Sequence, residues 1–144
     1  MAIVTFYEKP GCRGNLRQKA LLAAAGHIVE ARNLQTEPWS AEGLLAFLEK
    51  LPISEWFNRS APAIKSGELV PENLAFEHAL WLLLDDPLLI RRPLLVVGDQ
   101  RRVGFDAVAI DDWIGLNGVA LPEGNLEACM HPEEEGSHGR CNAH

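Results

Sequence analysis

The stretch KPGCRGN (Lys9–Asn15) separates two segments of opposite character. Ala2–Glu8 before it is rich in β-branched and aromatic residues, which predicts a strand. Leu16–Ala25, after it, consists of strong helix formers. Gly26 follows, and glycine is the residue that most often ends a helix. His27–Asn33 then resumes a strand pattern. The order strand, turn, helix, strand predicts a right-handed βαβ unit with parallel strands.

The middle of the chain is predicted to be helical. Ser40–Leu51 has helical spacing of leucines, with Ser40 as the expected N-cap. Asn73–Leu84 is the second predicted helix, and Pro71 is expected in its first turn. Trp81 and its neighbours widen the apolar stripe of this second helix, so we expect it to be heavily buried.

The last predicted elements are a hairpin and a closing helix. Leu94–Val97 and Arg101–Phe105 form the hairpin around a turn at Gly98-Asp99-Gln100. Asp106–Leu116 fits a helix. The whole order predicts an α/β, thioredoxin-like domain over residues 1–116, with a four-stranded mixed sheet and a helical insertion. Residues 117–144 are expected to form a flexible acidic tail that contains cysteine and histidine.

Charge and composition argue against several classes of protein. The net charge of −7 argues against general nucleic-acid binding, which usually requires a basic face. The longest apolar run, Ala79–Leu84, is far shorter than the roughly 20 residues of a membrane-spanning helix. The N-terminus has no basic region followed by a long apolar core, so we expect no signal peptide and a cytoplasmic protein. An odd count of 3 cysteines does not suggest a disulfide scaffold.

Cys12 is the first candidate functional residue. It is predicted to lie where a helix begins, and there the free backbone N–H groups and the helix dipole stabilise a thiolate or a bound oxyanion. Gly11 and Gly14 would let a reactant approach the backbone closely. The alternative interpretation is that Cys12 is a small core residue at the end of a strand.

Three motifs carry a resemblance to a known family. The segment FYEKPGC, then Asn58-Arg59, then LLIRRPLLVVGDQRRVGF together resemble the glutaredoxin-coupled arsenate reductases and their relatives, which include the Spx-type transcription regulators. The similarity extends over Ile3–Trp113. Within that family, GCRGN and HALWLLLDDPLLIRRPLL resemble the nitrogenase-associated proteins of nitrogen-fixing bacteria. The resemblance also implies a thioredoxin-like fold.

The resemblance implies a specific chemistry. Cys12 matches the nucleophile that attacks arsenate, and glutathione, helped by glutaredoxin, then resolves the adduct. Arg59 and Arg92 match arginines that bind the oxyanion, a task that suits the planar guanidinium fork. Pro93 matches a position that is usually a cis proline facing the cysteine. Glutathione or glutaredoxin is thus the expected reductant, and no bound cofactor or metal ion is expected.

The chain departs from the reductases at three places. Phe105 stands where a third arginine is expected, and Asn15 and Leu16 stand where the reductases have serine and arginine. Asn15 also excludes the internal Cys-x-x-Cys disulfide of the redox-sensing regulators. Two functions therefore remain open: a thiol-based redox or regulatory protein of nitrogen fixation, and a non-catalytic protein that binds a nitrogenase-assembly or metal-supply partner. Arsenate reduction is a third alternative, and whether the chain is an enzyme is left open.

The tail is a second candidate site. The last sixteen residues contain side chains suited to zinc, copper or iron: Cys129, His131, His138, Cys141 and His144. Their spacing does not reproduce a zinc-finger pattern. The alternatives are incidental residues in a disordered tail, a weak metal-binding or delivery role, and a cysteine that resolves an oxidised Cys12. No metal site is assigned.

Overall fold

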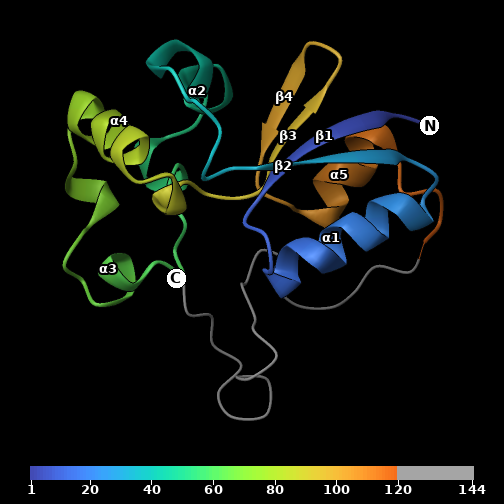
Figure 1. The fold of residues 1–144 in the computed structure, drawn as a ribbon, viewed down its shortest axis with the longest axis horizontal. Coiled ribbons are helices and arrows are strands. Elements are labelled where there is room, and N and C mark those ends of the chain that lie inside the picture. Colours follow the sequence, from blue (N-terminus) through green and yellow to red (C-terminus); the bar gives the residue numbers. More distant parts are fainter. Residues whose placement is uncertain (120–144) are drawn as a thin grey trace.

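The computed structural model describes residues 1–119 (Figure 1). Its strands and α-helices, in chain order, are β1 Ile3–Glu8, α1 Arg13–Ala24, β2 Ile28–Asn33, α2 Ala41–Leu48, α3 Pro62–Lys65, α4 Phe76–Asp85, β3 Leu94–Val97, β4 Gln100–Val103 and α5 Ala107–Ile114. Short 3₁₀ turns lie at Ile53–Glu55, Pro71–Asn73 and Pro87–Leu89.

The four strands form one mixed sheet in the order β2-β1-β3-β4. β1 and β2 are parallel, and their register runs from Ile3 opposite Ile28 to Glu8 opposite Asn33. β3 lies antiparallel to both β1 and β4. The predicted thioredoxin-like sheet is confirmed, with α2, α3 and α4 inserted between β2 and β3.

Helices cover the two faces of this sheet unequally. α1 and α5 lie together against one face, and α2 and α4 gather on the other side with the rest of the insertion (Figure 1). Side chains alternate along a strand, so neighbouring residues of β3 enter different cores. Leu95 packs with Phe6 and Leu22 in the first core, and Leu94 packs in the second. β3 therefore contributes side chains to both hydrophobic cores.

The predicted start of α2 is confirmed and that of α4 is wrong. The Ser40 hydroxyl accepts a hydrogen bond from the Gly43 N–H at 3.0 Å, as an N-cap does. Pro71 instead begins its own 3₁₀ turn, and Leu74 and Ala75 are extended before α4 starts at Phe76. Residues that were predicted to form the first turn of α4 therefore belong to this separate 3₁₀ turn and to the extended segment after it.

The prediction that α4 is heavily buried is also wrong. Only Ala79 and Leu83 of this helix are buried. Phe76 is exposed, and Trp81 is 58% exposed. The apolar stripe is wider than the face that the second core covers, and the remainder meets solvent.

The C-terminal hairpin and helix follow the sequence closely. β3 has its predicted bounds, and a two-residue turn at Gly98-Asp99 brings Val97 opposite Gln100. β4 ends at Val103, earlier than predicted, because Gly104 takes a positive φ of 80°. The Asp106 carboxylate accepts a hydrogen bond from the Val108 N–H at 3.0 Å and caps α5.

The described chain ends against the first core. Leu116 is buried, and Val119 packs on that core. The Asn117 side-chain amide donates to the Ala25 carbonyl. The predicted Cys/His tail lies, from residue 120 onward, outside the described residues. Within residues 1–119, each helix is too short or too polar to cross a membrane.

Candidate functional site: a thiol and two buried cations

Cys12 occupies the junction of β1 and α1. The loop after β1 turns at Gly11, whose φ is +84°, and Cys12 follows in an extended conformation as the N-cap of α1. Its N–H donates to the Lys9 carbonyl at 3.1 Å. The helix begins at Arg13, three residues earlier than predicted, so the cysteine adjoins the first helical turn. The Cys12 side chain is buried, with 2% of the residue exposed.

The first turn of α1 is electrostatically positive. Its N–H groups have no carbonyl partners within the helix, and the turn contains no acidic residue. The helix dipole therefore acts without a carboxylate to offset it. A thiolate or an oxyanion at this position would be stabilised.

Asn15 holds the Cys12 loop in place. Its side-chain oxygen accepts a hydrogen bond from the Lys9 N–H at 3.0 Å, and its amide donates to the Gln18 side chain at 2.9 Å. Both Asn15 and Gln18 are buried. The residue three positions after Cys12 is thus a structural clamp, a role that the sequence analysis missed. The available signal was an asparagine in the first turn of the helix, where its side chain can hydrogen-bond to nearby backbone groups.

Arg92 is a buried arginine whose side chain has no hydrogen-bond partner within residues 1–119. Only 4% of the residue is exposed, and none of its three guanidinium nitrogens has a hydrogen-bond partner in the described part of the chain. The peptide bond between Arg92 and Pro93 is cis. A buried, uncompensated guanidinium is costly, so the fold presents a positive charge that nothing within residues 1–119 satisfies.

Lys9 is a second buried cation, and the sequence analysis did not single it out. The residue is 8% exposed, and its Nζ has no hydrogen-bond partner among the described residues. Burial lowers the pKa of Lys9 below its usual value, the positive charge of Arg92 lowers this pKa further, and Cys12 opposes the shift. Arg92 and Cys12 are therefore each close enough to Lys9 to act on its ammonium group electrostatically.

Arg59 is in a different environment. Half of its side chain is exposed, and its Nη2 atom donates to the Ser54 carbonyl at 2.9 Å and to Glu72 Oε2 at 2.6 Å. The hydrogen bond from Arg59 lowers the pKa of the Glu72 carboxyl. Of the two arginines proposed from the sequence, Arg92 is buried and acts electrostatically on Lys9 of the Cys12 loop, whereas Arg59 is paired with Glu72 on the surface.

The family follows from comparison with known proteins. The model of the ArsC family matches residues 14–113. The chain belongs to the ArsC family. It is also 48% identical, over 98% of its length and 95% of the relative, to an uncharacterised 15.7 kDa protein from the draG 3′ region of Rhodospirillum rubrum.

Solved structures of the ArsC family share the fold. An ArsC-family-related protein from Bacteroides fragilis has a TM-score of 0.66 at 24% identity, covering 76% of this chain and 95% of the other. A protein described as a possible arsenate reductase from Streptococcus mutans has a TM-score of 0.59 at 29% identity, covering 77% of this chain and 99% of the other.

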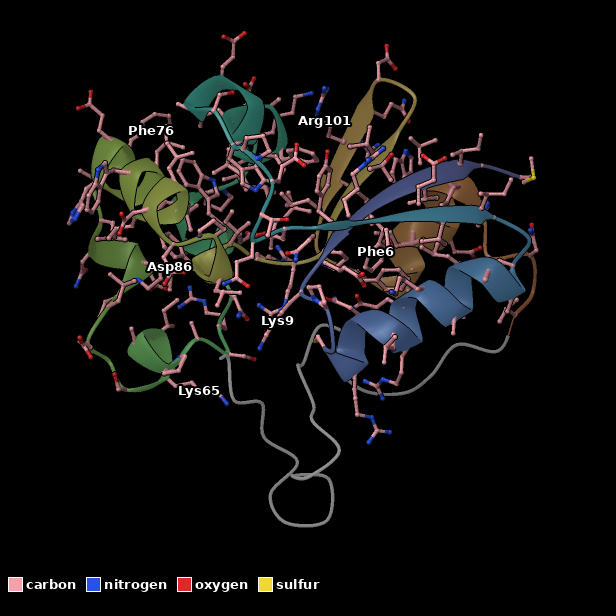
Figure 2. All side chains as sticks on the ribbon, in the orientation of Figure 1. Phe6, Lys9, Lys65, Phe76, Asp86 and Arg101 are labelled. Carbon is pink, nitrogen blue, oxygen red and sulfur yellow. The ribbon has the colours of Figure 1, made fainter. Side chains whose placement is uncertain are left out.

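This ArsC protein has no guanidinium at the position where the resemblance expects a third arginine. Phe105 stands there and is buried in the first core. The hairpin arginines do not replace it: Arg101 lies over the Phe47 ring at 5.7 Å and Arg102 over the Trp113 ring at 4.7 Å. Figure 2 shows Arg101 beside the hairpin, at the opposite end of the sheet from Lys9.

No metal centre is present in the part of the ArsC protein that the structure describes. Residues 1–119 bring no three cysteine, histidine or acidic side chains together in a metal-binding cluster. The tail residues proposed from the sequence, Cys129 to His144, lie outside the described range, and their metal-binding role stays a prediction.

Proposed function

We propose that this chain is a thiol-based redox or regulatory protein in which Cys12 is the reactive thiol and Arg92 binds an anion beside it. The observation that carries the proposal is the buried guanidinium of Arg92, which has no partner among the described residues. Proteins retain such uncompensated charges mainly where a ligand supplies the missing counter-charge. Membership of the ArsC family, whose model matches residues 14–113, supports a redox role for the domain.

The proposed reaction is thiol–disulfide exchange. The Cys12 thiolate attacks one sulfur of glutathione disulfide, the S–S bond breaks, and one glutathione leaves as a thiolate that takes up a proton from water. A second glutathione, or a glutaredoxin thiol, then attacks the glutathione sulfur of the mixed disulfide. A new disulfide forms between the attacking thiol and that glutathione, and Cys12 leaves as a thiolate. Proteins of the ArsC family are typically coupled to glutathione and glutaredoxin, so the proposal includes one of these as the reductant and a cytoplasmic location.

Arg59 has a conditional role in this proposal. Its guanidinium is occupied by Glu72 and by the Ser54 carbonyl. Exposed ion pairs are weak, so an anion at the site can compete for Arg59. Arg92 is therefore the fixed anion ligand, and Arg59 contributes only when its contact with Glu72 opens.

A non-catalytic binding role is the second candidate. The burial of Cys12 and the clamp at Asn15 favour it, because a thiol that is 2% exposed reacts only after the loop opens. Arsenate reduction, in which sulfur binds arsenic with loss of water and thiols supply the two electrons, is the third. Phe105 disfavours it, since the expected third guanidinium is replaced by a core residue.

The link to nitrogen fixation is a finer proposal. It is supported by the resemblance of GCRGN and of His78–Leu95 to the nitrogenase-associated subgroup. A nitrogenase-related protein is then the expected partner, either for redox regulation or for metal supply. Deletion of the gene in a nitrogen-fixing host should lower nitrogenase activity, and unchanged activity would remove this link.

The reactive-thiol proposal is tested by alkylation of Cys12. The protein carries Cys129→Ser and Cys141→Ser, so that only Cys12 reacts with iodoacetamide. Phosphate should slow the reaction in this background and have no effect after Arg92→Ala, whereas chloride at equal ionic strength should slow neither protein. Incubation with glutathione disulfide should add one glutathione. A thiol that takes up no glutathione and ignores phosphate would end the proposal.

A further inference from the structure

We propose that Lys9 is the second fixed cation of the anion site, so that Lys9 and Arg92 together select a compact oxyanion carrying up to two negative charges. This inference rests on the proposed function, because it assumes that Arg92 binds an anion beside Cys12. It assigns a residue that neither the family motif nor the sequence analysis places in the site.

The first support is the environment of the Lys9 ammonium group. An ammonium loses its hydration on burial, and native proteins restore the loss with a carboxylate or several acceptors. Lys9 is 8% exposed, and its Nζ has neither kind of partner within residues 1–119. Arg92 shares this condition, so two like charges act on each other in one buried region.

The second support is that the nearby acidic residues are already used. Glu8, the neighbour of Lys9 in the chain, pairs with Lys19 at 2.6 Å. Glu55 lies 3.7 Å from the Arg91 guanidinium. Lys19, in the middle of α1, therefore takes the carboxylate of Glu8, and the Lys9 Nζ has no hydrogen-bond partner within residues 1–119. The missing negative charge is left for a ligand.

The third support is the way in which Lys9 is attached to the thiol loop. Its N–H donates to the Asn15 side chain, and its carbonyl accepts from the Cys12 N–H. Both backbone groups of Lys9 are therefore tied to the start of α1. The root of the lysine side chain is fixed relative to the sulfur, as a positioned binding group requires.

Charge balance defines the class of ligand. Two cations are neutralised by a dianion when Cys12 is a thiol, or by a monoanion when Cys12 is a thiolate. Tetrahedral oxyanions such as phosphate offer several acceptors to an ammonium and a guanidinium at once. Phe105 stands where the resemblance expects a third arginine, so one positive charge is missing from the site. Lys9 supplies that positive charge.

The experiment compares phosphate binding by four full-length proteins in isothermal titration calorimetry: the wild type, Lys9→Met, Lys50→Met and Arg92→Ala. Lys50 is an exposed lysine and serves as the matched control. Lys9→Met should weaken phosphate binding about tenfold or more, because it removes a charged hydrogen-bond donor. Lys50→Met should stay within about twofold of the wild type. Sodium chloride holds the ionic strength constant.

Thermal unfolding provides an independent readout on the same proteins. Without phosphate, Lys9→Met should melt at a higher temperature than the wild type, because it removes a buried unpaired charge. With phosphate, the wild type should gain more than the variant. A Lys9→Met protein that is less stable than the wild type without phosphate would contradict the inference.

The outcomes separate the two proposals. If Arg92→Ala loses phosphate and Lys9→Met keeps wild-type affinity, the role of Lys9 is overturned and the proposed function stands. If the wild type itself binds no phosphate and Cys12 takes up no glutathione, both proposals fail. Loss of binding in both variants, with Lys50→Met unchanged, supports the assignment of Lys9.

Discussion

The cations of this protein fall into two regions with opposite chemistry. On the surface, Arg59 is paired with Glu72, and Arg101 and Arg102 lie over aromatic rings. In the interior, where the loop after β1 carries Cys12, Lys9 and Arg92 have no partner among the described residues. Surface charges cost little whether or not they are paired, whereas buried charges require compensation. The unsatisfied interior region is therefore the better indicator of function.

The contrast between surface and interior also distinguishes two arginines to which the sequence resemblance gives the same role. The sequence resemblance predicts an anion-binding role for both Arg59 and Arg92, yet of the two only Arg92 is buried and without a hydrogen-bond partner within residues 1–119. A motif records the type of a residue and its spacing. The cost of leaving its charge unpaired depends on neighbours that are distant in the sequence.

The largest expected effect contrasts these two arginines. Arg92→Ala should weaken phosphate binding by at least about 100-fold, since it removes a buried charge that binds the ligand directly. Arg59→Ala should change the affinity by less than about fivefold, because Arg59 must first leave Glu72. Calorimetric titration of both variants measures the difference. Equal losses would place Arg59 in the site on the same terms as Arg92.

The next effect concerns stability. Lys9→Met should raise the free energy of unfolding by about 1 to 3 kcal/mol at neutral pH without phosphate, as measured by urea unfolding. Arg92→Met should act in the same direction, whereas Lys50→Met should stay within about 0.5 kcal/mol. Destabilisation by both interior substitutions would mean that the two charges are compensated after all.

The pH dependence of this stability has a defined sign. Because the pKa of Lys9 in the folded protein lies below 10.5, there is a pH window below 10.5 in which the unfolded chain holds a proton that the folded chain has released. The stability of the wild type should therefore rise with pH through that window. Lys9→Met should lack this rise, so the difference between the two proteins should shrink as pH approaches 10.5.

A smaller effect tests the clamp that holds the interior region together. Asn15→Ala leaves the Lys9 N–H without its acceptor and should destabilise the protein by about 1 to 3 kcal/mol in urea unfolding. Asn33→Ala removes a similar hydrogen bond, to the Gln35 N–H, from an exposed turn and should cost about 0.5 kcal/mol. Similar costs for the two variants would show that Asn15 has no special role in the loop.

The smallest effect belongs to the surface region. The hydrogen bond from Arg59 lowers the pKa of Glu72 below 4.5, so this contact stabilises the fold above that pH and is lost as the pH falls through the lowered value. Arg59→Ala should raise the Glu72 titration midpoint, followed by NMR, toward its usual value, because it removes the largest cause of the lowered pKa. An unchanged midpoint would mean that the ion pair does not persist in solution.

The fold was largely predictable from the sequence, and the charge pattern of the site was not. Alternation and helical spacing are local properties, and they placed the βαβ unit and the hairpin. The exposure of Trp81 was missed, because the width of an apolar stripe does not tell which part of it a neighbouring element covers. Lys9 was missed because its neighbour in the sequence, Glu8, looks like its partner. In the folded protein Glu8 pairs with Lys19 instead, and the sequence does not show this.

The central claim is that Lys9 and Arg92 form an uncompensated cationic site beside Cys12. The most direct test measures the rise in melting temperature caused by phosphate over chloride at equal ionic strength, in the wild type and in the double variant Lys9→Met, Arg92→Met. We expect a clear rise in the wild type and none in the double variant, which should already melt at a higher temperature without phosphate. An equal rise in both proteins, or a double variant that melts lower without phosphate, would contradict it.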